Sequence, residues 1–209
     1  MISAVIQAKL NAPLSRVATV IAKTGITPNA LTLGGLLINL IVAYLFSQGR
    51  FLAAGLLMIP GGCLDFLDGP LARVMGRDRG IGLLIDSVVD RYSDLLILMG
   101  IAVFYADRGR TGTVLLTLVV MVGFLLVPYT RARAEALIPS CRVGFMERPE
   151  RWFLLSLGGV INQLPIVLWI LAVLTHFTVA QRIYFTWRQI GGGGGLRWPP
   201  CGTIGWAGS

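Results

Sequence analysis

Long apolar runs without a charged residue dominate the chain. The first extends from Thr24 to Gly49, the second from Thr111 to Thr130, and the third from Trp152 to Gln181. About 20 apolar residues cross a bilayer as an α-helix, and each run reaches or approaches that length. The pattern therefore predicts an integral membrane protein built from helices.

Interruptions in the apolar pattern divide the chain into six predicted spans. As a helix the third run would be about 45 Å long, more than one hydrocarbon core but less than two full spans. The polar sequence Asn162-Gln163 followed by Pro165 favours a break into two helices. The expected spans are Leu31–Phe46, Phe51–Leu71, Gly80–Tyr105, Thr111 to about Leu137, a short helix from near Pro149, and Pro165 to about Arg188.

Two flanking segments differ from the six-span region at residues 27–190. Residues 1–26 carry basic residues among apolar ones and predict an amphipathic helix lying on the membrane surface. Residues 191–209 begin with five glycines and show no hydrophobic period, so we expect a disordered tail. The predicted fold class is all-α integral membrane, with six transmembrane helices preceded by an N-terminal amphipathic surface helix.

Composition agrees with this class, and charge gives an orientation. Charged residues make up 13% of the chain, against about 25% in soluble domains. Of the 18 Lys and Arg residues, all but Arg50, Arg108 and Arg110 fall on the side of the predicted termini. By the positive-inside rule this side is cytoplasmic, which predicts a multi-pass protein of the cell membrane with both termini in the cytoplasm. The membrane thus accounts for the net charge of +8, and we expect no nucleic-acid partner.

Four aspartates occupy the cytoplasmic ends of the second and third predicted spans. Asp65 and Asp68 share one helix face, and Asp86 and Asp90 share a face of the next helix. An aspartate at the centre of a span costs roughly 2.5–3.5 kcal/mol, so these side chains need compensation. One form of compensation is neutralisation by neighbouring arginines at a solvated helix end. A divalent cation is the other, because Mg²⁺ and Mn²⁺ prefer carboxylate oxygens.

The spacing of eight residues between Asp65 and Asp90 reads D-x2-D-G-x2-A-R-x8-G-x3-D-x3-D. This pattern resembles the signature of the CDP-alcohol phosphotransferases, and the six-span pattern extends the resemblance over roughly Met1 to Ile190. The resemblance implies a homodimeric membrane enzyme, with its active site facing the cytoplasm, in which an alcohol attacks a CDP-linked lipid and CMP leaves.

The resemblance also implies roles for individual residues. It makes Asp90 the general base. Two Mg²⁺ or Mn²⁺ ions per active site would be held by Asp65, Asp68, Asp86 and Asp90. The CDP-lipid would be bound by Asp68, Gly69, Ala72, Arg73 and Gly82.

Arginines at the cytoplasmic ends of the last three spans suggest a phosphorylated acceptor. Guanidinium groups suit bidentate phosphate recognition, although positive-inside bias also places arginines there without a function. The candidates for binding the acceptor phosphate are Arg131, Arg148, Arg151 and Arg182. The stretches 128–135, 147–151, 181–182 and 90–94 are similar to the branch that makes phosphatidylinositol phosphate or archaetidylinositol phosphate from inositol phosphate. Because Arg131 stands where that branch usually has lysine, glycerol 3-phosphate is kept as an alternative acceptor.

Two other classes of protein also carry aspartates in membrane helices. Aromatic prenyltransferases use D-x2-D motifs, but their two motifs lie far apart in sequence, whereas all four carboxylates here fall within 65–90. A cation or proton transporter would place such residues near the midplane, commonly between inverted repeats. The compact spacing of the carboxylates favours the transferase over a prenyltransferase, and their position at one helix end favours it over a transporter.

Overall fold

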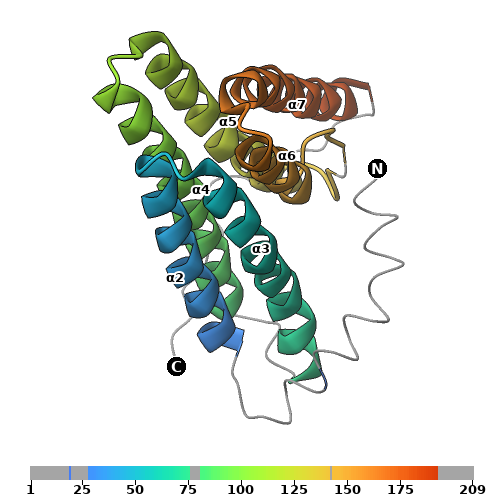
Figure 1. Cartoon of the computed structure of the whole chain (residues 1–209). Helices are drawn as coiled ribbons and strands as arrows, with labels where there is room; N and C mark the ends of the chain where they lie inside the picture. Colours follow the sequence, from blue (N-terminus) through green and yellow to red (C-terminus); the bar gives the residue numbers. More distant parts are fainter. Residues whose placement is uncertain (1–18, 20–27, 76–80, 142, 193–209) are drawn as a thin grey trace, which may run out of the picture.

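The computed structural model describes Thr19 and residues 28–75, 81–141 and 143–192, and the account below refers to these residues. They form six α-helices and no strand (Figure 1). The helices are α2 (Pro28–Ser47), α3 (Phe51–Val74), α4 (Ile81–Asp107), α5 (Thr111–Glu135), α6 (Arg148–Val160) and α7 (Leu164–Gly192). Apart from Thr19, and from Gly191 and Gly192 at the end of α7, the predicted N-terminal surface helix and the glycine-rich tail lie outside the described residues.

Each predicted span corresponds to a helix, and the boundaries differ by a few residues. The predicted break in the last apolar run is confirmed, because α6 ends at Val160 and α7 begins at Leu164. Asn162 adopts a positive φ of 56° in that turn, a conformation that asparagine tolerates better than most residues. At the other end, α7 continues past the predicted limit of Arg188 to Gly192.

The helices have the character expected of a membrane protein. α2, α5 and α7 are long and apolar enough to cross a bilayer. α3 is apolar over Phe51–Gly62 and then carries aspartates, and α6 has only 13 residues. Large apolar side chains face outward along several helices, for example Leu37 and Trp169. Such faces suit contact with lipid chains better than contact with water.

The helices pack as two connected groups, α2 with α3 and α4, and α5 with α7 (Figure 1). α2 lies against both α3 and α4, while α5 lies against α4 and α7. The short α6 packs on α3 and α7 and so joins the two groups. Close approach of backbones makes this arrangement possible: Ser156 of α6 donates a hydrogen bond to the carbonyl oxygen of Gly55 in α3 at 2.8 Å.

Replacing Gly100 by alanine should weaken the packing of α4 against α2. A Cβ at this position would fall on the carbonyl group of Ala43, so the two helices would have to separate. Overpacking of this kind costs about 1–3 kcal/mol, which we expect to see as a lower midpoint of thermal unfolding in detergent. Gly34→Ala is the matched control, because a Cβ there meets nothing within 4 Å. Equal midpoints for the two variants would contradict the close crossing.

Candidate active site

The family motif falls on two consecutive helices that are joined by a short connection. Asp65 and Asp68 belong to the C-terminal half of α3, and Asp86 and Asp90 to the first half of α4. Since α3 ends at Val74 and α4 begins at Ile81, both halves lie at the same end of the helix pair. Five motif residues are described only as part of helix α3, without further detail, namely Asp65, Asp68, Gly69, Ala72 and Arg73.

Asp86 is half-buried and carries an oxygen that lacks a donor. Its Oδ1 is buried and has no hydrogen-bond partner among the described residues. A buried carboxylate oxygen without a partner is costly, so it fits a position that a cation would satisfy. Among the described side chains, no three of His, Cys, Asp or Glu gather as a metal site. Asp86 and Asp90 therefore supply half of the predicted ligand set, and the other half belongs to α3.

Asp90 is paired with an arginine from a distant part of the chain. The Nη1 atom of Arg148, the first residue of α6, lies 2.6 Å from Oδ1 of Asp90. Arg91 lies further off, with its Nη2 at 3.7 Å from Oδ2. A guanidinium group expected to bind the acceptor thus contacts the expected general base directly.

Asp94 is a buried acid that the sequence analysis did not assign to a site. Only 2% of the residue is exposed. Its Oδ1 accepts a hydrogen bond of 2.9 Å from Nε1 of Trp152 and lies 3.6 Å from Nε of Arg148. Its Oδ2 lies 3.5 Å from Nη2 of Arg151. The available signal was the spacing, since Asp86, Asp90 and Asp94 recur every four residues along one face of α4.

Arg151 is buried and fills a gap in the hydrogen bonding of α5. Pro128 lies inside α5 and has no N–H, so the carbonyl group of Phe124, four residues earlier, lacks its helical donor. Nη1 of Arg151 donates to that carbonyl oxygen at 3.0 Å. The guanidinium carbon also lies 4.4 Å from the centre of the Phe124 ring, within cation–π range.

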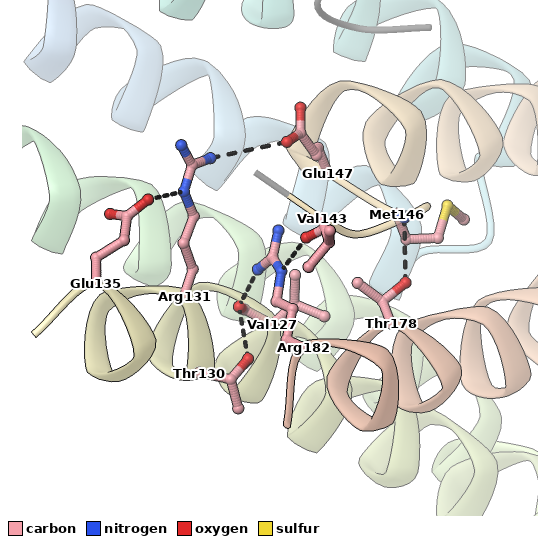
Figure 2. Close-up of polar contacts among 9 residues, drawn as sticks. All are labelled: Val127, Thr130, Arg131, Glu135, Val143, Met146, Glu147, Thr178 and Arg182. Carbon is pink, nitrogen blue, oxygen red and sulfur yellow. Dashed lines mark hydrogen bonds and ion pairs between the residues drawn. The ribbon is translucent and has the colours of Figure 1, made fainter. Parts of the chain in front are cut away.

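Arg182 is also buried, and it holds the segment between α5 and α6 (Figure 2). Its Nε donates to the carbonyl oxygen of Val143 at 2.9 Å, and its Nη1 donates to that of Val127 in α5. Gly144 adopts a φ of 140° against this guanidinium group, where a Cβ would lie 2.9 Å from Nη2. Thr178 adds a second tie from α7, because its hydroxyl accepts a 3.1 Å hydrogen bond from the backbone N–H of Met146.

Arg131 is the most exposed of the four predicted acceptor arginines. Figure 2 shows its contacts with two carboxylates. Its Nε lies 3.0 Å from Oε1 of Glu135, and its Nη1 lies 3.7 Å from Oε1 of Glu147. Glu147 directly precedes Arg148 and α6. All four arginines therefore converge on the segment from Val143 to Arg151, two of them exposed in part and two buried.

Comparison with known proteins identifies the family. Residues 25–190 match the family model described as CDP-alcohol phosphatidyltransferase. The chain belongs to the CDP-alcohol phosphatidyltransferase family, and it is an enzyme of this class that acts in phospholipid biosynthesis. The resemblance carried by the pattern from Asp65 to Asp90 is thereby confirmed.

Two of the similar proteins are synthases of the inositol phosphate branch of the family. The archaetidylinositol phosphate synthase of Pyrococcus horikoshii is 37% identical over 180 residues, which cover 86% of this chain and 93% of that protein. The phosphatidylinositol phosphate synthase of Mycobacteroides abscessus is 32% identical over 186 residues, covering 85% of this chain and 83% of that protein.

Solved structures give the same branch. The phosphatidylinositol phosphate synthase of Mycobacterium tuberculosis with CDP-DAG bound matches with a TM-score of 0.75 at 29% identity, covering 83% of this chain and 93% of that one. The same enzyme in complex with manganese and citrate matches with a TM-score of 0.73 at 29% identity, covering 83% and 88% of the two chains.

Proposed function

We propose that this enzyme transfers a phosphatidyl-type group, diacyl or diether, from a CDP-linked lipid to inositol phosphate, with release of CMP. The observation that carries the proposal is the 2.6 Å contact between Arg148 and Asp90. It brings a phosphate-binding type of side chain to the last carboxylate of the family motif. The names of the relatives and of the similar structures support the same acceptor.

Metal binding is assigned to the four aspartates of the motif. We propose that Asp65, Asp68, Asp86 and Asp90 hold two Mg²⁺ or Mn²⁺ ions. The donorless Oδ1 of Asp86 supports this assignment, as does the manganese complex of the mycobacterial enzyme. When bound, such ions would neutralise charge on the diphosphate and on the leaving phosphate. In this proposal the CDP-lipid is held by Asp68, Gly69, Ala72, Arg73 and Gly82.

Asp90 is proposed to act as the general base. The hydroxyl oxygen of the acceptor attacks the phosphorus atom that bears the lipid, and the bond from that phosphorus to the CMP oxygen breaks. The hydroxyl proton passes to the carboxylate of Asp90, because a carboxylate held within hydrogen-bond reach of a hydroxyl can accept its proton directly. Arg148 orients this carboxylate through its contact with Oδ1. Reactions of this type depend chiefly on positioning and charge, and these side chains would supply both.

The acceptor phosphate is assigned to the four arginines, in two different ways. Arg131 and Arg148 are exposed in part, and a guanidinium group has five N–H donors, so each can donate to a phosphate while it keeps its carboxylate contact. Arg151 and Arg182 are 1% and 2% exposed and are bonded to backbone carbonyl groups. We propose that Arg151 and Arg182 fix the shape of the acceptor site and add positive potential, while Arg131 and Arg148 contact the phosphate directly.

The acceptor is tested by a direct comparison of substrates. Purified enzyme with a CDP-linked lipid and Mg²⁺ should convert inositol phosphate far faster than free inositol or glycerol 3-phosphate, with CMP release and the lipid product both measured. Free inositol lacks the phosphate charge that the arginines would bind. Glycerol 3-phosphate carries that charge but is not the acceptor that the names of the relatives indicate. Faster use of glycerol 3-phosphate would replace the proposed acceptor, and absence of CMP release with every acceptor would remove the proposed reaction.

We also propose that all six helices cross the membrane and that the enzyme acts as a homodimer. In the proposed orientation the active site and both termini face the cytoplasm. In a background without Cys63, Cys141 and Cys201, Ser87→Cys should react with a membrane-impermeant thiol reagent only from the cytoplasmic side. The matched control is Thr111→Cys at the start of α5, which should react only from outside. Both positions are exposed in the structure. Labelling of both from one side would contradict the orientation.

A further inference from the structure

A buried carboxylate outside the family motif lies beside the proposed site. Asp94 follows Asp90 by one turn of α4, and three groups from α6 converge on it: Nε1 of Trp152, the guanidinium of Arg148 and that of Arg151. A buried carboxylate is stable only when it is paired and hydrogen-bonded. The four side chains therefore hold one another in place at the junction of α4 and α6.

Arg148 is bound at two points by this arrangement. Its Nη1 reaches Asp90 at 2.6 Å, while its Nε lies 3.6 Å from Oδ1 of Asp94, an ion pair longer than a hydrogen bond. The ring of Trp152 lies on another side, with its centroid 5.5 Å from the guanidinium carbon. Because the guanidinium group is planar and rigid, holding Nε near Asp94 fixes the direction in which Nη1 points.

We propose that Asp94 is a positioning residue that orients Arg148 for the acceptor phosphate. This inference rests on the proposed function. Asp94 touches neither the acceptor nor the CDP-lipid in this scheme, and acts through Arg148, the more exposed of its two arginine partners. Trp152 supports the same orientation by donating to Oδ1 of Asp94 and by lying against Arg148. Acceptor binding would then depend on a residue that the family motif does not include.

The first test separates the KM for the acceptor from that for the lipid. Asp94→Asn can still accept the hydrogen bond from Trp152 but loses the charge that faces Arg148. We expect the acceptor KM to rise by about tenfold, the effect of losing about 1.4 kcal/mol of binding, while the KM for the CDP-lipid changes less than about twofold. Asp107→Asn, at the exposed far end of α4, is the matched control and should leave both constants unchanged. Equal changes in both KM values for Asp94→Asn would overturn the proposal.

A double-mutant cycle with Arg148 tests whether the effect passes through that side chain. In an Arg148→Ala background, Asp94→Asn should no longer raise the acceptor KM, because the group that it positions is absent. A rise as large as in the wild-type background would refute the proposed route. If Asp94→Asn does not fold, Trp152→Phe serves in its place, since it removes the donor to Asp94 and keeps an aromatic ring. It should raise the acceptor KM alone, and no change would count against the proposal.

A readout without turnover keeps this inference separate from the proposed reaction. Phenylglyoxal modification of individual arginines, followed by mass spectrometry, should proceed faster at Arg148 in Asp94→Asn than in wild type, because the guanidinium group loses one of its two carboxylate contacts. Arg131 is the internal control, since it contacts Glu135 and Glu147 and not Asp94. An unchanged rate at Arg148 would overturn the positioning role even if the enzyme uses inositol phosphate. A faster rate would support it even if the wild-type enzyme prefers another acceptor, whose KM would then be measured.

Discussion

Asp86→Asn and Asp90→Asn should each lower the rate of CMP release by at least about a hundredfold while the protein still inserts and folds. For Asp90 the expected size is that of losing a positioned general base, which contributes about 10²–10⁴. For Asp86 it follows from the buried Oδ1, which has no donor among the described residues and is proposed to bind a metal ion. The measurement is CMP release from a CDP-linked lipid at saturating Mg²⁺, with thermal unfolding as the check on folding.

Asp107→Asn provides the comparison for these variants, because Asp107 is an exposed aspartate on the same helix. It should retain the wild-type rate. Chelation of divalent ions should reduce the wild-type rate to that of Asp86→Asn, and restored Mg²⁺ or Mn²⁺ should recover wild type alone. Normal turnover of Asp86→Asn in the presence of chelator would disprove the metal assignment.

Arg148→Ala should produce the largest loss in acceptor affinity. A hydrogen bond to a charged group contributes about 1.5–3 kcal/mol, so the acceptor KM is expected to rise about 10- to 100-fold while that for the CDP-lipid changes little. The variant also releases Asp90 from its 2.6 Å contact, so a decrease in kcat should accompany the change in KM. Initial rates over a matrix of both substrate concentrations would separate these effects.

Arg133→Ala is the matched control for Arg148→Ala. Arg133 lies on α5 at the same end of the molecule but is exposed, so its loss tests the effect of removing one positive charge without removing the contact to Asp90. It should change the acceptor KM less than about threefold at moderate salt. Similar changes for both variants would mean that general positive potential, and not the position of Arg148, governs acceptor binding.

The helices and the class of the protein could be predicted because each depends on local sequence. Hydrophobic length located the apolar helices, and Asn162 with Pro165 marked the turn between α6 and α7. The spacing from Asp65 to Asp90 was sufficient for the family, since all eight residues lie on two consecutive helices. The membrane orientation is still a prediction, because it depends on the distribution of charge and not on the helices themselves.

The partners of the polar residues could not be predicted in the same way. Nothing in the sequence pairs Trp152 with Asp94, yet its indole N–H donates a hydrogen bond to Asp94, which is 58 residues earlier in the chain. All four arginines were expected to bind the acceptor phosphate in the same way, whereas Arg151 and Arg182 point inward and donate to backbone carbonyl groups. Which arginines point inward depends on packing between helices, and a rule based on charge and membrane side contains no such information.

The hydrogen bond between Arg151 and α5 has a consequence for how this sequence can change. Pro128 leaves the carbonyl group of Phe124 without its helical donor, and Arg151 supplies a donor in its place from the neighbouring helix. Losing Arg151 alone would leave that carbonyl bare inside the protein, and losing Pro128 alone would give the guanidinium group a competitor in the backbone N–H of residue 128. Evolutionary drift at position 128 should therefore be correlated with drift at position 151, even though 23 residues separate them.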